Sequence, residues 1–199
     1  MNRAFIVGNG TSRKDFDLTQ LIDNGKIYGC NALYREFKPD YLIAVDVKMI
    51  LEINQSGYQN INLVYTNPNK AYSKFKNFNF FDPSKGWSSG PTALWFASQH
   101  QYDEIFILGF DYKGLDNGEK VNNIYAGTPN YKKITDNATY YGNWLRQTTT
   151  VIQQNPKIRY IRVTDNSTNF VPDQLKNFKN LIHISVNDFK KSFNILGIA

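Results

Sequence analysis

The 199-residue sequence has a single cysteine, Cys30, and two histidines, His100 and His183. One cysteine forms no disulfide within the chain, and no Cys/His spacing matches a zinc site. No apolar run approaches the roughly 20 residues that a membrane-spanning helix needs, and the N-terminus lacks the regions of a secretion signal. We therefore expect a cytoplasmic protein without a membrane span, a structural metal or a disulfide framework.

Positive charge is in modest excess, with 23 Lys and Arg against 17 Asp and Glu, a net charge of +6. The basic residues are scattered along the chain and form no basic stripe. The resulting positive electrostatic field favours binding of anionic small molecules, phosphates or nucleic acid, and it does not select among them. The length suits one domain with a single core, so we expect one domain over residues 1–199.

Short apolar or β-branched runs alternate with segments of helical spacing. The runs are nearly continuous rather than alternating, which is typical of strands covered on both faces. We therefore predict an α/β fold: a single Rossmann-like domain with a mainly parallel sheet of about seven strands and helices on both faces. The expected strands lie near residues 4–7, 27–30, 41–45, 61–65, 104–108, 158–163 and 181–184, and the helical segments near 16–22, 49–53, 93–97 and 144–152.

Two long polar connections interrupt this pattern. The first follows the strand that ends in "ILGFD" and is rich in Gly, Asn, Lys and Tyr. A loop of this length is usually functional or disordered, and its tyrosines argue against disorder, so we predict a lid-like insertion over residues 112–143. The second, residues 67–87, leads into a helix near Pro91 that Ser88 or Ser89 can cap and where Gly90 permits close approach of a ligand.

The first strand ends in the turn "GNGTS", residues 8–12. Ligands of open α/β sheets bind beyond the carboxyl ends of the strands, and the first strand-to-helix turn commonly presents backbone N–H groups to an anion. Gly8 and Gly10 would permit a positive φ and a close approach, Asn9 would offer an amide, and Thr11 and Ser12 could cap a helix or bind phosphate. The alternative is a tight turn without a ligand, since glycine is common in turns. The turn matches neither GxGxxG nor the P-loop motif.

Polar residues also follow other strands: Asn31 the second, Asp46 the third and Asp111 the fifth. Because the carboxyl ends of parallel strands meet at one edge of a sheet, these residues and the helix start at Ser89 and Gly90 predict a cleft suited to a nucleotide. Asp46 would bind a ribose or an acceptor, or would be satisfied within the fold.

The order of three motifs suggests a family. "GNGTS", then "CNALY", then "SSGPTALWFASQHQYDEIFILGFDY" resembles, over roughly residues 4–145, the bacterial sialyltransferases of glycosyltransferase family 42 and the related motility-associated flagellin glycosylation proteins. The resemblance implies a GT-A-like, Rossmann-type domain with a lid. It also implies a CMP-linked nucleotide sugar as donor, a glycan or other hydroxyl acceptor, and no metal or other cofactor.

The resemblance further implies roles for individual residues. Asn9 and Gly10 would contact phosphate or ribose, and Asn31 the sugar or phosphate. Ser89 and Gly90 would lie on the nucleotide, and Asp111 beneath the ligand. Hydroxyl groups can stabilise the charge of a phosphate leaving group; by the resemblance, the lid residues that do so would be Tyr125 and Tyr131.

The sequence departs from the family at the general base. The family has a histidine in a "YxGH"-like context, whereas "TYYGNW" places Asn143 there, and an amide takes no proton near neutral pH. Three alternatives stay open: another base such as Asp111 or Asp136, a different donor, or a nucleotide or sugar-nucleotide binding protein without catalysis. His100 and His183 are poor substitutes by position.

Two other patterns have ordinary explanations. Asp15 and Asp17 form a DxD sequence, which binds a divalent metal in many glycosyltransferases. They begin a helical segment, so we favour capping and stabilisation by the helix dipole. Lid tyrosines could stack on single-stranded nucleic acid, but without a basic groove we do not expect a nucleic-acid partner.

Overall fold

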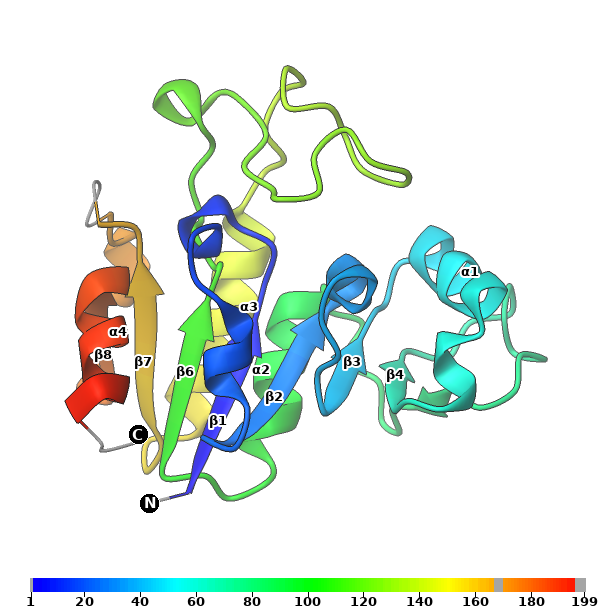
Figure 1. Ribbon diagram of the computed structural model, residues 1–199, viewed down its shortest axis with the longest axis horizontal. Helices are drawn as coiled ribbons and strands as arrows, with labels where there is room; N and C mark the ends of the chain where they lie inside the picture. Colours follow the sequence, from blue (N-terminus) through cyan, green and yellow to red (C-terminus); the bar gives the residue numbers. More distant parts are fainter. Residues whose placement is uncertain (1, 167–169, 196–199) are drawn as a thin grey trace.

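The computed structural model describes residues 2–166 and 170–195; residues 1, 167–169 and 196–199 of the expected 1–199 domain lie outside this part (Figure 1). One sheet has eight strands, all parallel, in the order β5-β4-β3-β2-β1-β6-β7-β8. The strands are β1 (Arg3–Val7), β2 (Lys26–Cys30), β3 (Tyr41–Ile43), β4 (Val64–Thr66), β5 (Asn79–Phe80), β6 (Glu104–Leu108), β7 (Arg159–Thr164) and β8 (Leu181–Ser185). The predicted Rossmann-like α/β class is confirmed, with one strand more than expected.

Four α-helices flank the sheet in the described residues: α1 (Val47–Ser56), α2 (Ser89–Ser98), α3 (Gly142–Gln154) and α4 (Val186–Ile195). The sequence patterns indicated the first three. The segment near 16–22 is only a short 3₁₀ turn, η2 (Leu18–Leu21). A left-handed residue, Asp23 with φ 65°, follows directly, so no longer helix continues there.

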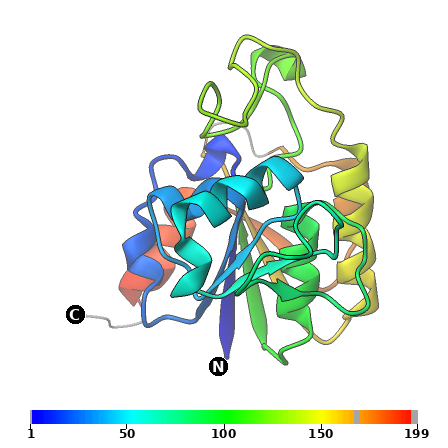
Figure 2. The same ribbon diagram turned by 90° about the vertical axis from the view of Figure 1, so that its right-hand side faces the viewer.

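Buried side chains of the strands divide between two cores. In β1, Phe5 and Val7 pack with α1 and α4, whereas Ala4 and Ile6 pack with α2 and α3. Figure 2 shows α4 on one side of the sheet and α3 on the other. A strand buried on both faces reads as a continuous apolar run, which explains the sequence pattern.

The strand order reverses between β1 and β6. From β1 the chain adds β2 to β5 on one side, then returns to place β6 to β8 on the other. Val7 pairs with both Gly29 and Leu108, so the turns after β1, β2 and β6 begin side by side. Such a switch point is where a doubly wound sheet opens a crevice for a ligand.

The expected insertion, 112–143, covers this edge of the sheet, and its last two residues belong to α3. Its chain rises above the carboxyl ends of β1 and β6 and returns to α3 (Figure 1). It has little regular structure: η5 (Asp116–Gly118) and two isolated bridges, Leu115 with Lys120 and Lys120 with Asn137. We call residues 112–141 the lid. Within the described ranges, no helix is long and apolar enough to cross a bilayer.

Candidate functional site

A cavity of about 560 Å³ lies between the strand ends and the lid. Its volume is within the range of small-molecule sites, roughly 300–1,000 Å³. The expected residues that line it are Gly8, Asn9, Gly10, Asn31, Asp46, Ser89, Gly90, Asp111 and Tyr131. The predicted convergence of the strand ends is therefore observed.

Four of the five N–H groups of the turn over residues 8–12, which we expected to be free for an anion, are engaged; that of Asn9 has no partner among the described residues. The N–H groups of Gly8 and Gly10 donate to the carbonyls of Leu108 (2.8 Å) and Gly109 (2.9 Å) at the end of β6. Thr11 N donates to Asn122 Oδ1 (2.8 Å), and Ser12 N to Asp111 Oδ2 (3.0 Å). These hydrogen bonds fix the turn to β6 and to the lid.

The two glycines serve close packing between turns. Neither Gly8 nor Gly10 has a positive φ, contrary to our expectation; Gly109 does, at 68°. A Cβ on Gly8 would lie 2.8 Å from the Gly109 carbonyl, and one on Gly10 would lie 2.5 Å from the Asp111 carboxyl. The glycines therefore let the turns after β1 and β6 touch at the switch point.

Asn9 and Tyr131 meet at the cavity wall. Asn9 Nδ2 donates to the Tyr131 hydroxyl (3.2 Å), which also accepts from Ala32 N (3.3 Å). With two hydrogen bonds accepted, the hydroxyl proton remains for another acceptor. Burial raises the pKa of Tyr131 well above its ordinary value, so the hydroxyl stays a neutral donor. Among the described residues nothing pairs with the buried Oδ1 of Asn9, although buried polar atoms are usually satisfied.

Asn31 and Ser89 are hydrogen-bonded across the sheet edge. The Ser89 hydroxyl donates to Asn31 Oδ1 (2.8 Å) and accepts from Val45 N (3.1 Å), which joins the ends of β2 and β3 to α2. Asn31 sits in the left-handed region, with φ 52°. Its Nδ2 group meets no acceptor in the part of the chain that the structure describes, so it is available to a ligand.

Two helix N-termini border the cavity without side-chain caps. Asp46, at the start of α1, makes no capping hydrogen bond, and neither does Ser88 at the start of α2, so the expected serine cap is absent. The first N–H groups of a helix lack partners within it and carry partial positive charge. This part of the wall, rather than the glycine turn, is suited to an anion.

Basic side chains add to this positive field. Lys48, Lys113 and Lys132 line the cavity. Behind it, the buried Arg162 donates to the carbonyls of Phe110 (2.8 Å) and Asp111 (3.1 Å). Burial lowers the pKa of Arg162, yet an arginine stays charged in proteins. The positive charge of Arg162 therefore lies next to the backbone of Phe110 and Asp111, just after β6.

The two carboxylates of the cavity differ in their partners. Asp111 accepts from the backbone N–H and the hydroxyl of Ser12. Asp46 has no hydrogen bond or ion pair with any described residue, contrary to the alternative of a carboxylate satisfied within the fold. Although Asp46 is open to the cavity, desolvation by the surrounding protein raises its pKa above the ordinary value.

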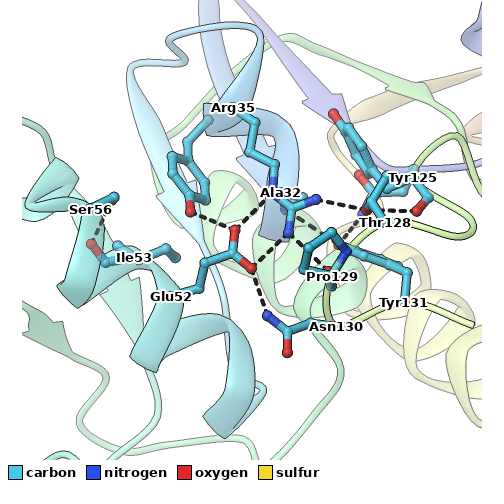
Figure 3. A network of polar contacts seen from close by, with 12 residues as sticks. Ala32, Arg35, Glu52, Ile53, Ser56, Tyr125, Thr128, Pro129, Asn130 and Tyr131 are labelled. Atoms are coloured by element: carbon cyan, nitrogen blue, oxygen red, sulfur yellow. Dashed lines mark hydrogen bonds and ion pairs between the residues drawn. The ribbon is translucent and has the colours of Figure 1, made fainter.

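A charged cluster holds the tip of the lid against α1 (Figure 3). Arg35 donates to both carboxylate oxygens of Glu52 (2.7 and 2.6 Å), to Thr128 Oγ1 (2.8 Å) and to the Pro129 carbonyl (3.0 Å). Glu52 also accepts from Asn130 Nδ2 (2.6 Å). We call Arg35, Glu52, Thr128, Pro129 and Asn130 the latch.

Four expected site residues lie outside the cavity wall. The hydroxyl of Thr11 donates to Asn122 Oδ1 (2.8 Å), and Ser12 binds Asp111. Tyr125 is buried and donates to Glu36 Oε1 (2.6 Å), so it braces the lid. Asn143 is exposed on α3. Thr11, Ser12 and Tyr125 therefore hold the lid and the turns in place and do not line the cavity.

The other candidate groups also lie elsewhere. Asp17 accepts from Thr19 N (2.9 Å) at the start of η2, the expected capping. The alternative base Asp136 accepts from Lys133 N (2.8 Å) in the lid and does not line the cavity. His100 contacts the Tyr28 hydroxyl (2.8 Å), and His183 lies in β8 beside Arg162. No histidine of the described chain borders the cavity.

Several lining residues were not predicted from the sequence as site residues. They include Lys48, Lys113, Lys132, Asn122, Tyr141 and Trp144. The lysines carry no local motif, and their convergence depends on how the lid folds back. Tyr141 and Trp144 lie close to Asn143 in the chain and line the cavity, whereas Asn143 itself does not.

No protein-family model, curated protein or solved structure matches the chain. The function of the cavity must therefore be inferred from its own residues.

Proposed function

We propose that this protein binds a nucleotide-activated sugar in the cavity, a CMP-linked sugar of the kind that sialyltransferases use, and transfers the sugar to an acceptor hydroxyl without a metal. The observation that carries the proposal is the position of the cavity at the switch point between β1 and β6, beneath a lid. Nucleotides bind at this place in doubly wound sheets.

The chemistry of the wall supports a phosphorylated ligand. Two uncapped helix starts and three lysines provide positive charge for a phosphate. The Asn31 amide and the Tyr131 hydroxyl provide donors for a sugar or for the leaving phosphate. Transfer from a sugar nucleotide needs that developing charge to be stabilised, which a preorganised neutral donor does.

The alternative is a binding protein of the same fold without catalysis. The absence of a histidine from the described cavity wall favours this alternative, because the family that the sequence resembles uses histidine as its base. Both readings require the nucleotide to bind.

A thermal-shift panel tests the binding. We expect CMP and CDP, at about 100 times the dissociation constant, to raise the free energy of unfolding by about 3 kcal/mol and the melting temperature by roughly 5–10 °C. AMP, GMP and UMP should have smaller effects. Asn9→Ala should abolish the shift, whereas Asn143→Ala, an exposed position outside the cavity, should keep it. A flat panel would reject both readings.

A further inference from the structure

We propose that Asp46 is the general base of this transfer and removes the proton from the acceptor hydroxyl. The inference rests on the proposed function and identifies the residue that replaces the missing histidine. It is carried by geometry: Asp46 borders the cavity at the start of α1, and its carboxylate has no partner among the described residues.

The other candidates for a base are engaged or distant. Asp111 already accepts two hydrogen bonds from Ser12. Asp136 is bound to the lid backbone outside the cavity. Asn143 is exposed and has no basic group. A carboxylate that has no internal partner is free to accept a proton from a bound hydroxyl, and Asp46 is the one that meets this condition.

The surroundings of Asp46 suit the role. Desolvation raises its pKa, which makes the carboxylate a better proton acceptor than an ordinary aspartate. Burial, and to a smaller extent the negative charge of Asp46, raises the pKa of Tyr131, so its hydroxyl is a neutral hydrogen-bond donor. The site thus pairs a proton acceptor with a donor suited to the leaving group.

In the proposed step, Asp46 takes the proton of the acceptor O–H group. The acceptor oxygen forms a bond to the anomeric carbon of the donor sugar. The bond between that carbon and the phosphate oxygen breaks, and its electron pair stays on the phosphate, which leaves as CMP. Asp46 then loses its proton to solvent. With water as acceptor, the products are free sugar and CMP.

The test combines binding and turnover with CMP-N-acetylneuraminic acid as donor and water as acceptor. In Asp46→Asn we expect CMP affinity within about twofold of the unmodified protein and CMP release slowed about 100-fold or more, the size of a typical general-base contribution. Asp17→Asn is the matched control, because Asp17 also precedes a helical turn but lies outside the cavity. It should release CMP at the normal rate.

The pH profile separates a base from a structural role. The titratable groups that share the cavity with Asp46 are Cys30, Lys48, Asp111, Tyr112, Lys113, Tyr131, Lys132 and Tyr141. Burial raises the pKa values of Cys30 and Tyr131, so both stay protonated in acid. The release rate should fall as the pH drops through the raised pKa of Asp46, and Asp46→Asn should lose this acidic limb. A limb that persists in Asp46→Asn would overturn the assignment.

The outcomes distinguish the two proposals. If CMP does not bind, the proposed function fails and this inference with it. If CMP binds but the unmodified protein releases none from the donor, the protein binds without catalysis and Asp46 is no base. If the unmodified protein turns over and Asp46→Asn does so equally, only the assignment of Asp46 is wrong.

Discussion

At the scale of single residues, Tyr131 contacts several parts of the site at once. Its hydroxyl receives hydrogen bonds from the turn after β1 and from the start of η3 (Asn31–Arg35), and its proton is left for the cavity. Its ring lies beneath the Arg35 guanidinium, 5.7 Å from the ring centroid. One side chain thus joins the lid, two strand ends and the cavity.

Tyr131→Phe tests this position. Two hydrogen bonds accepted by the hydroxyl are lost, so we expect the free energy of unfolding to fall by about 1–2 kcal/mol. A donor to phosphate is lost as well, and CMP should bind about tenfold more weakly. Denaturant unfolding and calorimetric titration measure the two effects. Tyr140→Phe, whose side chain is exposed, should change neither. Equal affinity in Tyr131→Phe would place the phosphate elsewhere.

Among the elements of the fold, the lid depends on few contacts. It has no helix longer than one turn in the described residues. It attaches to the body through Tyr112, Asn122, Ile124, Tyr125, Tyr131 and the latch. Arg35 and Glu52 bring complementary charges to its tip, and a bidentate pair of this kind is stronger and more specific than an isolated ion pair. The latch therefore decides how firmly the cavity is closed.

Glu52→Gln should loosen the lid without unfolding the body. The substitution removes the charge that accepts from Arg35 and Asn130, which costs about 1.5–3 kcal/mol locally. We expect hydrogen exchange of the amides in 112–141 to rise roughly tenfold or more. Asp173→Asn, which breaks an exposed ion pair with Lys176, should leave exchange in the lid unchanged.

Acid should act on the latch in the same direction. The hydrogen bonds from Arg35, followed by those from Tyr34 and Asn130, lower the pKa of Glu52. A carboxyl group with a lowered pKa in the folded state stabilises that state above its unfolded pKa, and the contribution is lost as the pH falls. Exchange in the lid should therefore rise below about pH 4 in the unmodified protein, and lose this dependence in Glu52→Gln.

For the molecule as a whole, buried and partly buried tyrosine hydroxyls and one buried thiol lower the stability of the folded state in alkali. Burial raises the pKa values of Tyr34, Tyr160 and Cys30 to about 12. A raised pKa means that the folded state keeps protons that the unfolded chain has lost, so stability is complete below the unfolded pKa and declines above it.

We expect the melting temperature to fall progressively between about pH 9 and 12, where the unfolded tyrosines and cysteine ionise. Tyrosinate absorbance from the buried phenols should appear together with unfolding rather than as an independent titration. A melting temperature that stays constant up to about pH 11 would contradict the role of these tyrosines and of Cys30. Melting temperatures measured at acid pH would give the separate contribution of the carboxylates.

The sequence predicted the fold class because strands buried on both faces leave continuous apolar runs between helical segments, and this pattern is local. It missed β5, since two residues have no periodicity. It also missed α4, although Ser185 caps the start of this helix by accepting from Asp188 N (3.1 Å). It also predicted that polar residues after β1, β2, β3 and β6 converge, because parallel strands share one carboxyl edge.

What the sequence determined by itself was thus the layer architecture and the edge at which a site forms. Only the tertiary structure decided which groups are free there. Most N–H groups of the glycine turn donate to the end of β6, to Asp111 or to the lid, and Asp111 accepts from Ser12, whereas Asp46 has no partner among the described residues. The availability of a polar group depends on neighbours distant in the chain, and no local pattern records them.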